Sequence, residues 1–148
     1  MNRKLRMGMV GGGLDAFIGA VHRLAFNMDG LAELVCGALS INPEIAKQSG
    51  KVLFLPENRT YLTYEEMIEK ESKMPADQRM DFVTIVTPNF AHFAPAMLAL
   101  EKGFNVVIEK PITFTLDEAK QLKKKVEQTG LLLLLTILFA CFTIGYPE

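Results

Sequence analysis

Short apolar runs alternate with stretches of helical periodicity along this chain, and that alternation limits its fold more than any other feature. Strands that are apolar throughout are buried on both faces of a sheet, and helices between them carry the chain back to start the next parallel strand. Right-handed crossovers then leave few topologies, of which the Rossmann order is the leading one. We therefore expect an α/β, Rossmann-like, doubly wound and mainly parallel sheet. The predicted strands are residues 5–10, 34–39, 59–62, 82–86, 104–108 and 131–137, and the predicted helices are residues 16–28, 43–49, 64–71, 91–102 and 116–129.

Local signals mark the ends and faces of these helices. Asn42 before Pro43 is a good start for the second helix, and Thr63 and Thr115 each open a capping-box pattern. Gly103 and Gly130 are suited to end the helices before them. Apolar residues at helical spacing support the first helix and predict the packed face of the last one. They are Phe17, Val21, Leu24 and Met28 in the first, and Leu116, Ala119, Leu122 and Val126 in the last.

A glycine-rich turn separates the first strand from the first helix. Gly11, Gly13 and Ala16 have the G-x-G-x-x-G/A spacing of a dinucleotide-binding turn, in which the first N–H groups of the helix face a diphosphate. Asp15 would repel that diphosphate unless it points away, for example as the helix N-cap. No Gly-Lys-Ser/Thr follows, so the turn is not a P-loop.

Two further motifs follow predicted strands at the carboxyl edge of the sheet, where open α/β sheets bind ligands. They are Thr87-Pro88-Asn89 with His92, and Glu109-Lys110-Pro111. With the glycine turn before them, these motifs resemble those of the glucose–fructose oxidoreductase, inositol 2-dehydrogenase and rhizopine-catabolism (Gfo/Idh/MocA) family. The resemblance covers roughly residues 5–135, including Ile18–Arg23 of the first helix.

The resemblance implies an NAD(P)-dependent oxidoreductase that acts on CH–OH groups of sugars, inositols or related polyols. It assigns proton transfer to Lys110 as the catalytic residue. The chemistry agrees, because a lysine held near a cationic, partly desolvated ring can act as a base. His92 either reaches the cofactor or packs, and His22 is expected to pack. The residues expected to contact the dinucleotide are Gly11, Gly13, Ala16, Phe17, Ile18, Ser40, Thr87, Pro88, Asn89, His92, Glu109 and Lys110.

The choice between NAD and NADP stays open at this point. Sites for NAD often carry an Asp or Glu after the second strand, where this chain has Ser40. No arginine follows to hold a 2′-phosphate either. A methyltransferase-like Rossmann domain is a rival interpretation, and a non-enzymatic nucleotide-binding or interaction module is another. Ser40 speaks against the methyltransferase, which also favours an acid at this position.

The composition limits the kinds of binding partner that we expect. A net charge of −1 offers no basic field for nucleic acid. The two cysteines, Cys36 and Cys141, make neither a disulfide framework nor a metal site, so no metal is expected and a reducing cytoplasm fits. Cys36 is expected to be a small buried apolar residue. The N-terminal apolar run is too short for a signal peptide.

The end of the chain differs from the rest. We expect residues 1–137 to form the NAD(P)-binding domain and residues 138–148 an apolar tail, with the second, substrate-binding domain of the family absent. The apolar stretch is too short for a spanning helix, so a membrane partner is not expected. Three alternatives remain: a fragment of a longer enzyme, a stand-alone module, or a tail that binds a partner or membrane. An uncovered apolar tail also predicts a homo-oligomer.

Overall fold

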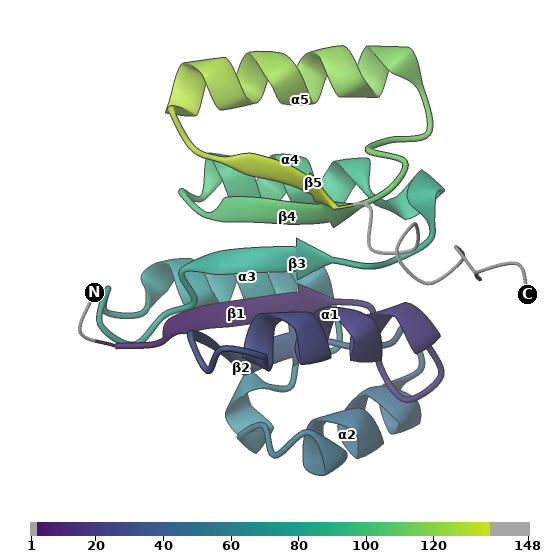
Figure 1. Cartoon of the computed structure of the whole chain (residues 1–148), viewed down its shortest axis with the longest axis vertical. Helices are drawn as coiled ribbons and strands as arrows, with labels where there is room; N and C mark the ends of the chain where they lie inside the picture. The colour runs from purple at the N-terminus through teal and green to yellow at the C-terminus, as the bar shows by residue number, and fades with distance from the viewer. Residues whose placement is uncertain (1–2, 137–148) are drawn as a thin grey trace, which may run out of the picture.

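The sheet is parallel and has five strands in the order β2-β1-β3-β4-β5 (Figure 1). The computed structural model describes residues 3–136, so the expectations for the tail fall outside the described part of the chain. β1 lies between β2 and β3. The chain therefore adds β2 on one side of β1 and β3 to β5 on the other, as in Rossmann folds. The predicted fold class is therefore confirmed. The strands are β1 (Leu5–Val10), β2 (Ala32–Ala38), β3 (Phe82–Ile85), β4 (Asn105–Glu109) and β5 (Leu133–Thr136).

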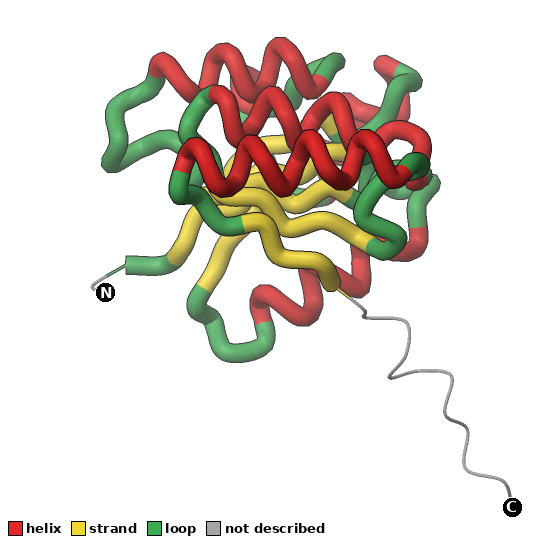
Figure 2. The backbone as a smooth tube through the Cα atoms, turned by 90° about the horizontal axis from the view of Figure 1, so that it is seen from above, coloured by secondary structure: helices red, strands yellow, loops and turns green. Residues whose placement is uncertain are grey.

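Helices cover both faces of this sheet (Figure 2). The helices are α1 (Phe17–Asn27), α2 (Pro43–Val52), α3 (Tyr64–Lys73), α4 (Phe93–Glu101) and α5 (Leu116–Thr129), with short 3-10 turns η1 (Glu57–Arg59) and η2 (Asn89–Ala91). Side chains of α3, α4 and α5 pack into one buried cluster, while α1 packs into a second cluster on the opposite face. Among the described helices, none is long and apolar enough to cross a membrane.

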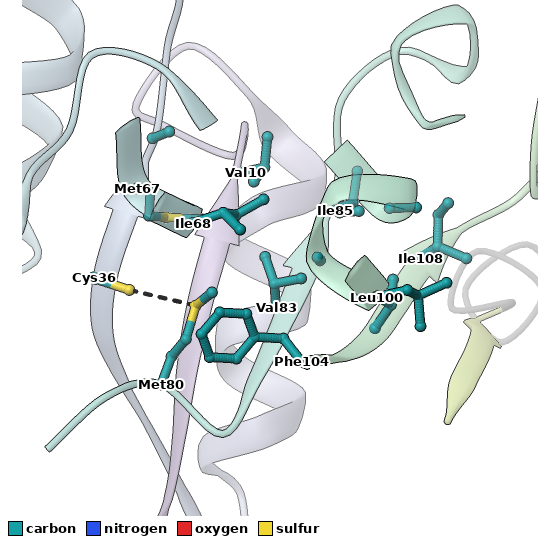
Figure 3. Close-up of a cluster of buried hydrophobic side chains, with 14 of the residues drawn as sticks. Val10, Cys36, Met67, Ile68, Met80, Val83, Ile85, Leu100, Phe104 and Ile108 are labelled. Carbon is teal, nitrogen blue, oxygen red and sulfur yellow. Dashed lines mark hydrogen bonds between the residues drawn. The ribbon is translucent and has the colours of Figure 1, made fainter. Parts of the chain in front are cut away.

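Alternation along the strands divides the core between the two faces, because successive strand residues point to opposite sides. In β1, Met7 and Met9 face α1, whereas Val10 belongs to the larger cluster with Val83 and Ile108 (Figure 3). Cys36 is fully buried there, as expected, with its thiol 3.8 Å from the sulfur of Met80. Burial raises the pKa of that thiol well above its ordinary value, so it behaves as an apolar residue.

The strand predicted at residues 59–62 does not form. Its first residue, Arg59, is the last residue of the 3-10 turn η1. A single β-bridge joins Thr60 to Gly37 of β2. One backbone bond supports it, from the N–H of Tyr61 to the carbonyl of Gly37 at 2.8 Å. The 3-10 turn leaves too little extended chain to continue along the sheet edge.

The predicted first helix is found as α1, but the apolar residues at helical spacing do not form its buried face. Phe17, Leu24 and Met28 are 74%, 72% and 84% exposed, while Gly19 and His22 are the buried residues of this helix. The helix buries its smallest residue, Gly19, against Gly12 because it crosses close to the glycine turn. The last helix follows its prediction better. Leu122 is buried, and Ala119 and Val126 are partly buried, but Leu116 is 70% exposed in the first turn.

Candidate functional site

The turn between β1 and α1 is pressed against the ends of two neighbouring strands. Gly11 has a φ of +76°, and a Cβ there would lie 3.0 Å from the side chain of Thr87 after β3. A Cβ at Gly13 would lie 2.8 Å from the carbonyl oxygen of Leu39 after β2. That same carbonyl accepts the N–H of Gly13 at 3.0 Å. Larger residues at these two positions would push the turn away from the carboxyl edge of the sheet.

A second glycine contact was missed by the sequence reasoning. Gly12, which occupies a variable position of the G-x-G-x-x-G/A spacing, has a φ of +73°, and a Cβ on it would lie 2.9 Å from the Cα of Gly19. A Cβ on Gly19 would in turn overlap the Cα of Gly12. This backbone contact sets α1 directly over the turn. The presence of Gly19 in the middle of a predicted helix was the available signal.

The amino terminus of α1 has no side-chain cap. Asn42, Thr63 and Thr115 each accept backbone N–H groups at the start of α2, α3 and α5. At α1 the N-cap is Ala16, whose side chain makes no such bond, and the first turn has no acidic residue. The first N–H groups of α1 therefore remain open beside the glycine turn. A helix end of this kind, with its positive dipole, favours an anion such as a diphosphate.

Asp15 does not cap α1, which corrects that expectation. Its carboxylate points toward the end of β2, where Oδ2 accepts a hydrogen bond from the Ser40 hydroxyl at 3.4 Å. The Ser40 oxygen in turn accepts the N–H of Asn42 at 3.2 Å. The negative charge nearest the turn is thus directed to the β2 side, away from the open helix end.

Two clefts lie at the carboxyl edge of the sheet, and Thr87 lines both. The β2-side cleft, about 330 Å³, is mostly apolar and runs from the glycine turn past the end of β2 to the start of α3. The β4-side cleft, about 370 Å³, lies between the start of α1 and the loops after β3 and β4. The β2-side cleft is lined by Val10, Gly11, Ala38, Ser40, Ile41, Leu62, Thr63, Tyr64, Glu65, Thr87 and Ala91. The β4-side cleft is lined by Phe17, Ile18, Thr87, Pro88, Asn89, Glu109, Lys110 and Pro111.

These clefts bring together most of the residues singled out in the sequence. Gly13 and Ala16 lie in the turn between them. His92 lies elsewhere: its ring is 1% exposed and lines neither cleft. Its Nδ1 is 2.9 Å from the carbonyl oxygen of Pro111, and its Nε2 is 2.7 Å from that of Thr87. His92 therefore ties together the loops that follow β3 and β4.

Glu109, Lys110 and Pro111 form the wall of the β4-side cleft. Glu109 is the last residue of β4 and is buried, whereas Lys110 is exposed. One carboxylate oxygen of Glu109 accepts the backbone N–H of Lys110 at 2.5 Å. The Lys110–Pro111 peptide bond is cis. Glu109 thus holds the backbone from which the Lys110 side chain extends.

The other oxygen of Glu109 faces His22 of α1. His22 is fully buried, and its Nε2 is 3.5 Å from Oε1 of Glu109. Burial lowers the pKa of His22, and the nearby carboxylate opposes that effect only in part. His22 is therefore neutral near pH 7. Within the described residues, neither ring nitrogen of His22 has a hydrogen-bond partner.

The arrangement fits a nicotinamide dinucleotide, which consists of two nucleoside halves joined by a diphosphate. The open helix end would hold the diphosphate, and a cleft is available on each side of it for one half. The lysine and the buried carboxylate both belong to the β4-side cleft. Between residues 3 and 136, no group of three or more His, Cys, Asp or Glu side chains could hold a metal ion.

Comparison with known proteins agrees with this geometry. Residues 5–137 match the model (GFO_IDH_MocA) of an oxidoreductase family with an NAD-binding Rossmann fold. The uncharacterized oxidoreductase YfiI of Bacillus subtilis is 35% identical over 131 residues, which cover 88% of this chain and 33% of the relative.

Solved structures are similar as well. The crystal structure of an oxidoreductase from Sinorhizobium meliloti is 45% identical, with a TM-score of 0.84, over 91% of this chain and 37% of that one. An inositol dehydrogenase homologue from Azotobacter vinelandii, complexed with NADH and myo-inositol, is 36% identical. Its TM-score is 0.87, over 92% of this chain and 35% of that one. The chain therefore spans about a third of the length of the relatives it matches.

Proposed function

Since this chain belongs to the Gfo/Idh/MocA family of oxidoreductases, we propose that its carboxyl-edge site serves the oxidation or reduction of a CH–OH group in a sugar, inositol or related polyol. One observation carries the proposal. The uncapped start of α1 lies beside two clefts that share Thr87, and one of those clefts contains Lys110.

The start of α1 and the two clefts then each bind one part of the dinucleotide. The N–H groups of Phe17 and Ile18, at the start of α1, hold the diphosphate. The apolar β2-side cleft takes the adenosine half. The β4-side cleft takes the nicotinamide half, against Pro88 and Asn89 from the loop after β3 and Lys110 from the loop after β4.

Lys110 is the residue we assign to proton transfer. The dinucleotide, when bound, supplies the hydride acceptor or donor. Loss of hydride from the CH–OH carbon leaves a carbonyl, and the hydroxyl proton has to move to a base within hydrogen-bond reach. The Lys110 amine takes that proton in oxidation and returns it in reduction. Glu109 fixes the backbone of Lys110, and His22 lies behind Glu109.

The substrate class rests on the relatives. The Azotobacter homologue was solved with myo-inositol, which is a polyol. Because this chain spans about a third of such relatives, we propose that residues outside 3–136 hold the substrate against the β4-side cleft. Hydride transfer needs the alcohol within near-attack distance of the nicotinamide, and the domain described would bind cofactor without turning over polyol.

Two measurements test the proposal. Fluorescence titration with NADH and NADPH should show saturable binding of at least one, whereas S-adenosylmethionine should not compete. In a protein that includes the part holding the substrate, Lys110→Ala should abolish turnover of inositols or sugars and leave NADH binding within a few-fold. Lys124→Ala, which changes an exposed lysine on α5, is the matched control. A protein that binds neither nicotinamide cofactor, or a Lys110→Ala variant that keeps full turnover, would contradict the assignment.

A further inference from the structure

We propose that Asp15 makes this site select NAD over NADP. The inference rests on the proposed function and adds the residue that discriminates between the two cofactors. They differ by one phosphate on the 2′-oxygen of the adenosine ribose, which in Rossmann folds lies beyond the end of the second strand. Here that position is the end of β2, at the β2-side cleft.

The acidic side chain at this position comes from the glycine turn rather than from the end of β2. An NAD site commonly has its Asp or Glu at the end of the second strand, where the acid accepts a hydrogen bond from a ribose hydroxyl. In this chain β2 is followed by Leu39, Ser40 and Ile41, none of which is acidic. The Asp15 carboxylate extends across from the glycine turn and lies 3.4 Å from the Ser40 hydroxyl. It therefore stands where the missing acid would stand.

A second carboxylate acts in the same direction as Asp15, which is bonded to the cleft residue Ser40. Glu65, at the start of α3, lines the β2-side cleft, and the residues that line this cleft include no Lys, Arg or His. A 2′-phosphate brings up to two more negative charges beside these carboxylates and finds no cation there. A 2′-hydroxyl can instead donate a hydrogen bond to Asp15.

The nearest helix end is not a substitute phosphate site. α2 starts just beyond Ser40, and an open helix end there could have held the 2′-phosphate. Its first N–H groups are already occupied, because the Asn42 side chain accepts those of Glu44 at 3.0 Å and Ile45 at 3.3 Å. The two helix ends of the site thus differ: α1 is open to the diphosphate, whereas α2 is closed by its own cap.

Paired titrations of the full chain with NADH and NADPH test the inference. At low salt we expect the wild type to bind NADH about tenfold more tightly than NADPH, as expected for like charges a few ångströms apart near a surface. Asp15→Asn keeps the size of the side chain and removes its charge, so most of this preference should disappear, chiefly through tighter NADPH binding. Asp29→Asn, beyond the far end of α1, is the matched control and should keep the wild-type ratio.

Two further measurements distinguish an effect of charge on cofactor preference from an effect of side-chain shape. Added salt should reduce the wild-type preference and leave the ratio of Asp15→Asn nearly unchanged, because exposed charges are screened. Ile41→Arg places a cation on a fully exposed residue of the cleft and should favour NADPH even with Asp15 present.

The outcomes distinguish this inference from the proposed function. Equal affinities in the wild type, or an Asp15→Asn variant that keeps the wild-type ratio or weakens both cofactors equally, would overturn the role of Asp15. Failure of the wild type to bind either cofactor would instead overturn the proposed function.

Discussion

α1 and α5 pack on opposite faces of the same sheet, and they differ in how they begin and in what they bury. α5 starts with a complete capping box, in which the Thr115 hydroxyl accepts the N–H of Glu118 and the Glu118 carboxylate accepts the N–H of Thr115. It ends at Gly130 in the left-handed conformation. α1 starts without a side-chain cap and buries a glycine and a histidine.

The difference shows which helix is arranged for stability and which for a ligand. α5 satisfies its first N–H groups with its own residues and buries Leu122 completely. α1 leaves its first N–H groups open, packs through Gly19, and turns large apolar side chains such as Phe17 to solvent. Departures from local helix rules are expected at functional sites, where stability is given up for binding.

The largest effect on stability should come from the core side of α5. Leu122→Ala removes a fully buried side chain and should lower the free energy of unfolding by about 3 kcal/mol, through lost burial and the cavity left behind. The NADH affinity of the folded variant should remain that of the wild type. Urea unfolding and NADH titration measure the two quantities, and a large loss of affinity would contradict the division between the helices.

Gly19→Ala should come next, with a sign opposite to that of helix propensity. In an open helix this change stabilises by about 1 kcal/mol. Here the new Cβ overlaps the Gly12 backbone, so we expect a loss of about 2 kcal/mol from overpacking. Because the glycine turn has to shift, NADH binding should weaken as well. Urea unfolding of Gly19→Ala beside an exposed α5 variant, Lys124→Ala, checks the sign; a gain in stability would show that α1 does not pack on the turn.

Removing the cap of α5 and adding one to α1 should change the free energy of unfolding by about 1 kcal/mol in opposite directions. Thr115→Ala should lower the stability and leave NADH binding unchanged. Ala16→Ser gives α1 the cap it lacks, so it should raise the stability but weaken NADH binding, since the new hydroxyl competes for the N–H groups that hold the diphosphate. Thermal unfolding and NADH titration of both variants test the exchange. Tighter NADH binding by Ala16→Ser would contradict an open helix end as the anion site.

The smallest effect concerns pH and follows from the buried His22. Its pKa is lower in the folded state than in the unfolded chain, mainly because of burial and despite the facing carboxylate of Glu109. Below the unfolded pKa of about 6.5, the unfolded chain therefore binds more protons than the folded one. Stability should fall as the pH drops from 7.5 to 5.5. His22→Gln, which replaces the imidazole with a polar side chain that does not titrate, should reduce that slope in urea unfolding, and an unchanged slope would argue against a buried neutral His22.

Patterns that depend on one element alone predicted most of the fold. The apolar strand runs, the Asn42 cap, the Thr115 capping box and the Gly130 helix end each act locally, and each is found in the structure. The sheet order followed from the right-handed crossovers between them.

What the sequence could not predict depends on contacts between elements. The buried face of α1 is decided by Gly12 against Gly19, two residues that meet only when the helix crosses the turn. The pairing of His22 with Glu109 joins α1 to β4, and the position of Asp15 depends on its hydrogen bond with Ser40 beyond the end of β2. The position of His92 between two loop carbonyls likewise required coordinates.

Amide chemical shifts of the ¹⁵N-labelled protein during NADH titration test the central claim most directly. We predict the largest saturable changes at residues 11–18, at Thr87 and at Lys110, with the start of α5 at Thr115 and Glu118 nearly unchanged. Shifts that are absent, or that centre on α5 and spare the start of α1, would contradict it.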